Sequence, residues 1–141
     1  MSEHTSSALP DIRKVIVLNA PIDKVWAAVA TSEGIAAWFM PNTFQPLEDY
    51  QFTLDAGPYG IVPCQVTDLN PPHLLRFDWG KDWQLSFELK PMGEKTELTL
   101  THSGWDANTV TEFDQPHTVI RGHMEQGWEK LQYALRDYVE A

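Results

Sequence analysis

The spacing of hydrophobic residues changes twice along the chain and divides it into three regions. In the first region, residues 13–19 contain an unbroken apolar run from Val15 to Leu18. A stretch that is apolar at successive positions predicts a β-strand that other parts of the protein cover on both faces.

Two short helices are expected after this strand. Apolar residues recur three and four positions apart from Ile22 to Val29, directly after Pro21. Proline suits the first turn of a helix because its φ angle is already helical and the N–H that it lacks would have no partner there. Ser32 is expected to cap a second helix that ends near Phe39.

In the second region, from residue 50 to residue 103, hydrophobic and polar residues alternate. A period of two predicts strands with one face in the core and one in solvent, and the glycine and proline residues between them mark turns. The residues that share the apolar faces are Tyr50, Phe52, Leu54, Val62, Cys64, Val66, Leu75, Phe77, Trp79, Trp83, Leu85, Phe87, Leu89, Leu98, Leu100 and His102.

The third region is a single long helix, expected over residues 117–140. At ~1.5 Å per residue it is about 36 Å long, enough to cross a whole sheet. Steps of three and four residues place an apolar stripe along one side of it. The stripe consists of Ile120, Met124, Gly127, Trp128, Leu131, Leu135, Tyr138 and Val139.

These elements predict an α+β protein with a helix-grip fold. A curved antiparallel sheet of about six strands would wrap around the long C-terminal helix, with the two short helices after the first strand. A curved sheet leaves a gap beside such a helix, which predicts a pocket. Residues 1–10 are expected to form a disordered tail, and residues 11–141 a single domain.

Charge and composition narrow the classes of function. Ten Lys and Arg residues against twenty Asp and Glu residues give a net charge of -10. Because such a chain repels phosphate groups, we expect no nucleic-acid partner. Since eighteen apolar residues nowhere follow one another, we expect no membrane insertion. The single cysteine, Cys64, excludes an internal disulfide. The absence of a signal peptide and the free thiol predict a cytoplasmic protein.

An ordered set of segments carries a family resemblance. It consists of the run from Asn19 to Trp26, the pair Trp38-Phe39, the stretch from Leu69 to Phe77, and the run from Gly127 to Leu131. In this order they resemble the START-like (SRPBCC, birch-pollen-allergen-like) superfamily. Within it, the chain is similar to the activator of heat-shock-protein-90 ATPase homologues and to the calicheamicin self-resistance protein. The resemblance extends over about residues 12–140 and implies that residues 11–141 form a START-like domain.

The resemblance implies three classes of function. The first is non-catalytic binding of a small, mostly apolar ligand, aromatic, polyketide-like or lipid-like, in a cavity between sheet and C-terminal helix. The alternative is an interaction protein that activates a chaperone ATPase. The third is a cyclase or hydrolase that uses His102 with Asp78 or Glu125 in the same cavity. We expect the first, in a monomer or weak dimer, with a chaperone as the alternative partner.

Strand phase and the helix stripe select the candidate cavity-lining residues, and none of them is assigned a catalytic role. They are Trp38, Phe52, Val66, Phe77, Leu85, Phe87, Leu100, His102, Met124, Gly127 and Trp128. No cofactor and no metal are expected. His117 and His123 lie six positions apart on the long helix and therefore point in different directions.

Some of these positions admit two interpretations. His102 either bonds a backbone carbonyl at the end of its strand or directs a polar group at a ligand. Gly127 either permits close packing of the helix backbone against the sheet or leaves room for a ligand. Trp38 either packs in the core or lies at the pocket mouth, where an aromatic wall suits a flat apolar ligand.

Overall fold

The computed structural model describes residues 8–57, 60–111 and 114–141. The long helix has the bounds expected from its apolar stripe. In chain order the elements are β1 Ile12–Leu18, α1 Ile22–Val29, α2 Ser32–Trp38, β2 Gln51–Asp55, β3 Ile61–Asn70, β4 Leu74–Trp79, β5 Trp83–Met92, β6 Lys95–Ser103 and α3 His117–Glu140.

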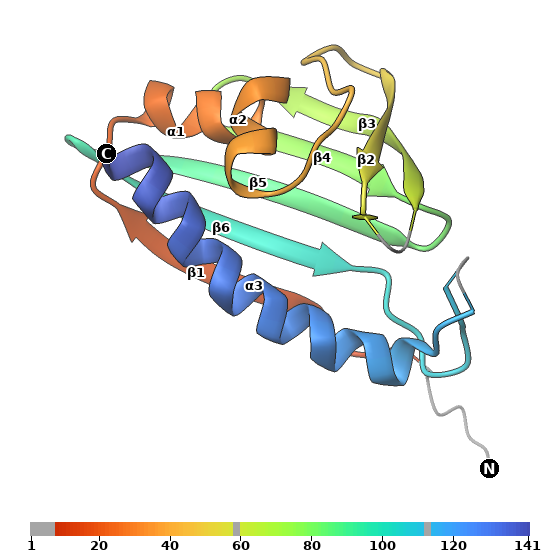
Figure 1. The fold of residues 1–141 in the computed structure, drawn as a ribbon. Coiled ribbons are helices and arrows are strands. Elements are labelled where there is room, and N and C mark those ends of the chain that lie inside the picture. The colour runs from red at the N-terminus through yellow and green to blue at the C-terminus, as the bar shows by residue number, and fades with distance from the viewer. Residues whose placement is uncertain (1–7, 58–59, 112–113) are drawn as a thin grey trace.

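The strands form one antiparallel sheet in the order β1-β6-β5-β4-β3-β2. Figure 1 shows the three helices on the same face of this sheet, with α3 alongside β1 and β6 and the two short helices beside it. The register of β3 against β4 shifts between Val66 and Asp68. An extra residue on one strand bends it and increases the twist of the sheet. The α+β helix-grip fold predicted from the sequence is confirmed.

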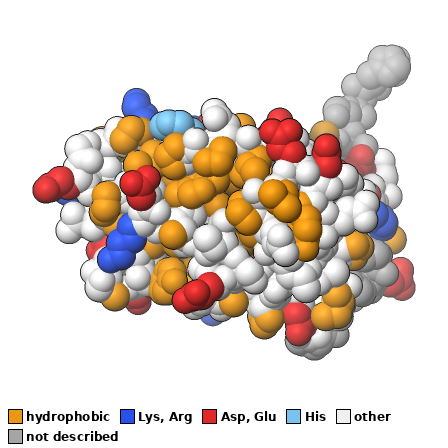
Figure 2. Space-filling model, turned by 90° about the horizontal axis from the view of Figure 1, so that it is seen from above, with side chains coloured by type: hydrophobic (Ala, Val, Ile, Leu, Met, Phe, Trp, Pro, Cys, Tyr) orange, Lys and Arg blue, Asp and Glu red, His pale blue; other side chains and the backbone are white. Residues whose placement is uncertain are grey.

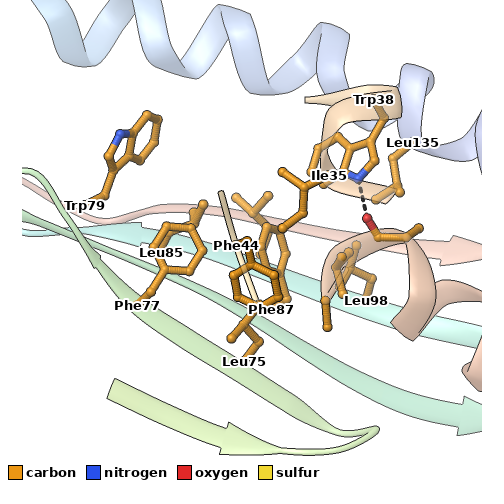
Figure 3. Close-up of a cluster of buried hydrophobic side chains, with 14 of the residues drawn as sticks. Ile35, Trp38, Phe44, Leu75, Phe77, Trp79, Leu85, Phe87, Leu98 and Leu135 are labelled. Carbon is orange, nitrogen blue, oxygen red and sulfur yellow. Dashed lines mark hydrogen bonds between the residues drawn. The ribbon is translucent and has the colours of Figure 1, made fainter. Parts of the chain in front are cut away.

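The core lies between the sheet and the helices. The alternating apolar residues of the strands point toward it and are almost fully buried. From α2, Trp38 packs edge-on against Phe87, with ring centroids 6.0 Å apart. Its indole Nε1 donates a hydrogen bond to the carbonyl oxygen of Ala28 at 2.8 Å, which joins α2 to α1 (Figure 3).

The first strand is covered on one face, so the predicted burial on both faces is wrong. Ile12 and Leu18 are buried, but the side chains of Val15 and Val17 are 46% and 42% exposed. Strand β1 lies at the edge of the sheet, and the helices pack against the face opposite these valines. The apolar run therefore reflects the preference of β-branched residues for strands as well as burial.

The second helix is capped by Thr31 rather than by Ser32. The Thr31 Oγ1 accepts a hydrogen bond from the backbone N–H of Gly34 at 2.9 Å, and Ser32 is the first helical residue. The same hydroxyl donates to the carbonyl oxygen of Ala27 at 2.6 Å. The cap therefore satisfies the start of α2 and also attaches it to α1.

Part of the expected N-terminal tail contacts the domain. Residues 1–7 lie outside the described residues. The backbone N–H of Leu9 donates to the carbonyl oxygen of Trp105 at 2.9 Å, and the Arg121 Nε donates to the carbonyl oxygen of Pro10 at 2.8 Å. The end of the expected tail is therefore attached to the loop after β6 and to α3.

The surface reflects the acidic composition. On the face seen in Figure 2, acidic side chains surround a central group of hydrophobic side chains. Across the described part of the chain, no helix combines the length and the apolar character needed to span a bilayer.

Candidate functional site

An apolar pocket opens between α3, the segment after α2 and the ends of β2 and β4. Its volume is ≈ 310 Å³. It occupies the position predicted for a gap between helix and sheet, and Asp55 is the charged residue in its lining. The lining residues are Phe39, Met40, Asp55, Ala56, Trp79, Met124, Gly127, Trp128 and Leu131.

Gly127 leaves space in the middle of the helical wall. A Cβ atom placed on Gly127 would meet no heavy atom within 4 Å outside its own helix backbone. Close packing of the helix backbone against the sheet therefore does not explain this glycine. Met124 and Leu131 are three and four residues away on the same side of α3 and line the same pocket. The open space agrees with the interpretation of Gly127 that leaves room beside the helix, and room for a ligand stays a prediction.

Trp128 and Phe39 form an aromatic wall of the pocket. The ring of Trp128 lies between two other indoles, with centroids 6.4 Å from Trp79 and 6.5 Å from Trp38. Figure 3 shows Trp79 and Trp38 at opposite ends of the core cluster. Phe39 lies 5.1 Å from Trp128 at an interplanar angle of 31°. These two rings therefore fill the space between Trp79 and Trp38.

His102 holds the Trp128 ring through a buried hydrogen bond. The Trp128 Nε1 donates to the His102 Nδ1 at 3.0 Å. Since an indole nitrogen can only donate, Nδ1 carries no proton and the neutral imidazole has its proton on Nε2. The interpretation in which the His102 side chain bonds a backbone carbonyl is therefore wrong. His102 does not line the pocket either, but it orients a residue that does.

Aromatic rings surround the His102 imidazole. Trp79 stacks on it with centroids 5.0 Å apart, and Trp83 and Trp105 lie at 4.9 and 4.7 Å. Within the described residues, Nε2 of His102 and Nε1 of Trp79 and Trp83 are buried without a hydrogen-bond partner. N–H groups next to ring faces make weak N–H···π contacts. The cluster therefore fixes the imidazole by packing on its other sides.

Burial strongly lowers the pKa of the His102 imidazole. It falls from 6.5 to about 3, mainly because desolvation penalises the charged form, and the positive charges of Arg121 and then His117 lower it further. The imidazole is therefore neutral near pH 7 and keeps its acceptor for Trp128. A base this weak is poorly suited to general-base catalysis at that pH.

The carboxylates named for the enzymatic hypothesis lie elsewhere. Asp78 alternates along β4 with the inward-facing Phe77 and Trp79 and so belongs to the outer face of the sheet. Glu125 lies 3.6 Å from Arg121 on the surface of α3. The proposed pairs with His102 are therefore not formed. Among the described residues, no three or more His, Cys, Asp or Glu side chains are grouped to hold a metal ion.

The structure distributes the predicted lining residues among several places. Met124, Gly127 and Trp128 line the pocket. Trp38 and Leu100 border a separate void of ≈ 10 Å³, which Trp128 also lines. The remaining ones are buried in the core, namely Phe52, Val66, Phe77, Leu85, Phe87 and His102.

The pocket is also lined by residues that the sequence pattern did not predict for it. Trp79 and Leu131 belong to the predicted apolar faces, and Leu131 lies one turn after Gly127, so their phase could have identified them. Phe39 follows α2, and Ala56 follows β2. Positions beyond the ends of elements carry no periodic signal, and only the path of the chain brings them to the pocket.

Comparison with known proteins identifies relatives of the whole chain. The family model described as activator of Hsp90 ATPase homolog 1-like protein matches residues 19–140. The solution structure of a protein from Bacillus halodurans has 42% sequence identity and a TM-score of 0.84, and the match covers 94% of this chain and 99% of that chain. No curated protein matches the sequence.

More distant solved structures share the fold. The Aha1 dimer from Colwellia psychrerythraea is 19% identical, with a TM-score of 0.75 over 94% of this chain and 97% of that chain. CalU16 from Micromonospora echinospora is 21% identical, with a TM-score of 0.72 over 92% of this chain and 75% of that chain. The resemblance stated from the sequence is confirmed.

Proposed function

We propose that this chain, which belongs to the activator of Hsp90 ATPase homolog 1-like family, binds a small apolar ligand in the pocket beside α3. The observation that carries the proposal is the open space at Gly127 within an apolar lining. Glycine inside a helix costs about 1 kcal/mol relative to alanine. Packing does not require a glycine at position 127. Space for a ligand would explain why this destabilising residue is there.

The volume of the pocket limits the size of the ligand. At ≈ 310 Å³ it lies at the low end of the range of ~300–1,000 Å³ that is typical of small-molecule sites. A single alkyl chain or a bicyclic aromatic group suits this volume better than a lipid with two acyl chains. The Phe39 and Trp128 rings, tilted by 31° to each other, line the pocket and favour a flat apolar group that can pack against an aromatic face.

The test fills the pocket and uses a matched control on the same helix. Gly127→Leu should place an isobutyl group in the pocket and weaken binding of the neutral fluorescent probe N-phenyl-1-naphthylamine by at least tenfold. Gly122 also has open space around an added Cβ but does not line the pocket. Gly122→Leu should therefore leave binding unchanged. Both variants should melt at or above the temperature of the wild type, because each recovers most of the ~1 kcal/mol that glycine costs.

The affinities of the three proteins distinguish a blocked pocket from a general effect on the helix. Equal affinity in the wild type and both variants would refute binding in this pocket, and so would a wild type that does not bind the probe. Equal loss of binding in both variants would place the effect in the helix as a whole, which also contradicts the proposal.

A chaperone partner is the second candidate, favoured by the description of the matching family. The measurement is the ATPase rate of Hsp90 with and without this protein. Stimulation by Gly127→Leu equal to that by the wild type would assign chaperone activation to a surface other than the pocket.

A further inference from the structure

Trp128 borders two separate spaces. On one side is the apolar pocket of ≈ 310 Å³, and on the other is the void of ≈ 10 Å³ that Trp38, Leu100 and Leu135 also line. Both spaces lie between α3 and the rest of the core. The indole of Trp128 is therefore a partition between them.

The geometry of α3 agrees with this arrangement. Successive residues are about 100° apart around a helix. Gly127 and Leu131 therefore lie to one side of Trp128 and line the pocket, while Gln132 lies to the other side and lines the void. Trp128 itself is 2% exposed and points into the core between these two sides.

The partition is held in place from more than one direction. His102 accepts the indole hydrogen bond at 3.0 Å, and Phe39 packs against the ring with centroids 5.1 Å apart. If the ring turned away, its buried N–H would lose its acceptor, which is unfavourable in an apolar interior. The hydrogen bond to His102 therefore favours the closed position of the ring.

We propose that Trp128, positioned by His102, determines the length of the apolar ligand that the pocket accepts. This inference rests on the proposed function. A ligand chain that enters past Phe39 and Gly127 ends against the indole. When a smaller side chain replaces Trp128, or the indole loses its hydrogen bond to His102, the pocket continues into the void. The ligand chain then reaches Trp38 and Leu100, which the sequence pattern had predicted to line the cavity.

The experiment measures affinity against chain length. A series of linear 1-alkanols, from hexanol to hexadecanol, displaces N-phenyl-1-naphthylamine from the protein. Each methylene that becomes buried should tighten binding about fourfold. In the wild type this increase should stop at the length at which the chain meets Trp128. In Trp128→Leu the increase should continue for about two further methylenes, so that the longest alkanols bind roughly fifteenfold more tightly.

Trp105 offers a matched control. It is also a buried tryptophan in contact with His102, and its Nε1 donates a hydrogen bond to the His102 carbonyl oxygen at 3.0 Å. It lines neither the pocket nor the void. Trp105→Leu removes a comparable ring and a comparable hydrogen bond, so it should lower stability without changing the limiting chain length.

Two variants test whether His102 positions the Trp128 ring. His102→Leu removes the acceptor and should lengthen the limiting chain as Trp128→Leu does. His102→Asn keeps an acceptor atom at nearly the position of Nδ1 and should restore the limit of the wild type. A purely structural role for His102 would change stability in both variants without changing the limit.

The outcomes are distinguishable from those of the proposed function. A wild type that binds no alkanol contradicts the proposed function itself. A wild type that binds alkanols with the same limiting length as Trp128→Leu and His102→Leu overturns the inference alone, and so does an equal shift in Trp105→Leu. If Trp128→Leu does not fold, Trp128→Phe replaces it, and an unchanged limit in that folded variant and in His102→Leu also overturns the inference.

Discussion

Acidification should destabilise the folded protein through His102. Its imidazole has a pKa of about 3 in the folded state, against 6.5 for an exposed histidine. At any pH between these values the unfolded chain binds a proton that the folded chain does not. The contribution to stability is therefore fully present above pH 6.5 and is lost progressively as the pH falls toward 3.

The magnitude follows from this difference in pKa. Between pH 7 and pH 5 the folded imidazole stays neutral, whereas an unfolded one with a pKa of ~6.5 becomes almost fully protonated, which lowers the free energy of unfolding by about 2 kcal/mol. This is a large share of the ~5–15 kcal/mol that stabilises a typical domain.

Urea unfolding of the wild type and of His102→Asn at pH 5, 6 and 7 tests the prediction. Asparagine does not titrate and still offers an acceptor to Trp128, so the variant should lose about 2 kcal/mol less over this range. At an m-value of ~2 kcal/mol/M this is a difference of about 1 M in the shift of the midpoint. The other histidines are present in both proteins, and their contributions cancel. Parallel curves for the two proteins would refute the argument that burial depresses the His102 pKa.

Two further predictions concern the connection between α1 and α2. Thr31→Ala should lower the free energy of unfolding by about 1 kcal/mol, because the N–H of Gly34 loses its cap, and an unchanged urea midpoint would contradict this role. Gly34→Ala should cost more, about 3 kcal/mol, since an added Cβ would overlap the carbonyl oxygen of Ala27, and backbone atoms cannot move aside as a side chain can. A melting temperature equal to that of the wild type would show that the two helices separate easily.

The pattern of the sequence was sufficient for the elements and for the fold class. Burial on one face imposes a period of two on strands and of 3.6 on helices, and both periods are local properties of the chain. For this reason the inward phase of β4 to β6 and the bounds of α3 were predicted correctly. The open space at Gly127 was also foreseen as one of two alternatives, since a glycine in an apolar stripe requires an explanation.

Tertiary structure alone decided what lies opposite each apolar face. Phe77 and Trp79 have the same phase and both are buried, yet only Trp79 lines the pocket, because it lies opposite Trp128 of α3 whereas Phe77 packs against Phe52. Val15 is exposed because the helices cover only the opposite face of the sheet. His102 meets Trp128, a residue distant in the sequence, only when α3 lies across the sheet. A period specifies which face of an element is apolar, but the partner across that face depends on how elements far apart in the chain pack together.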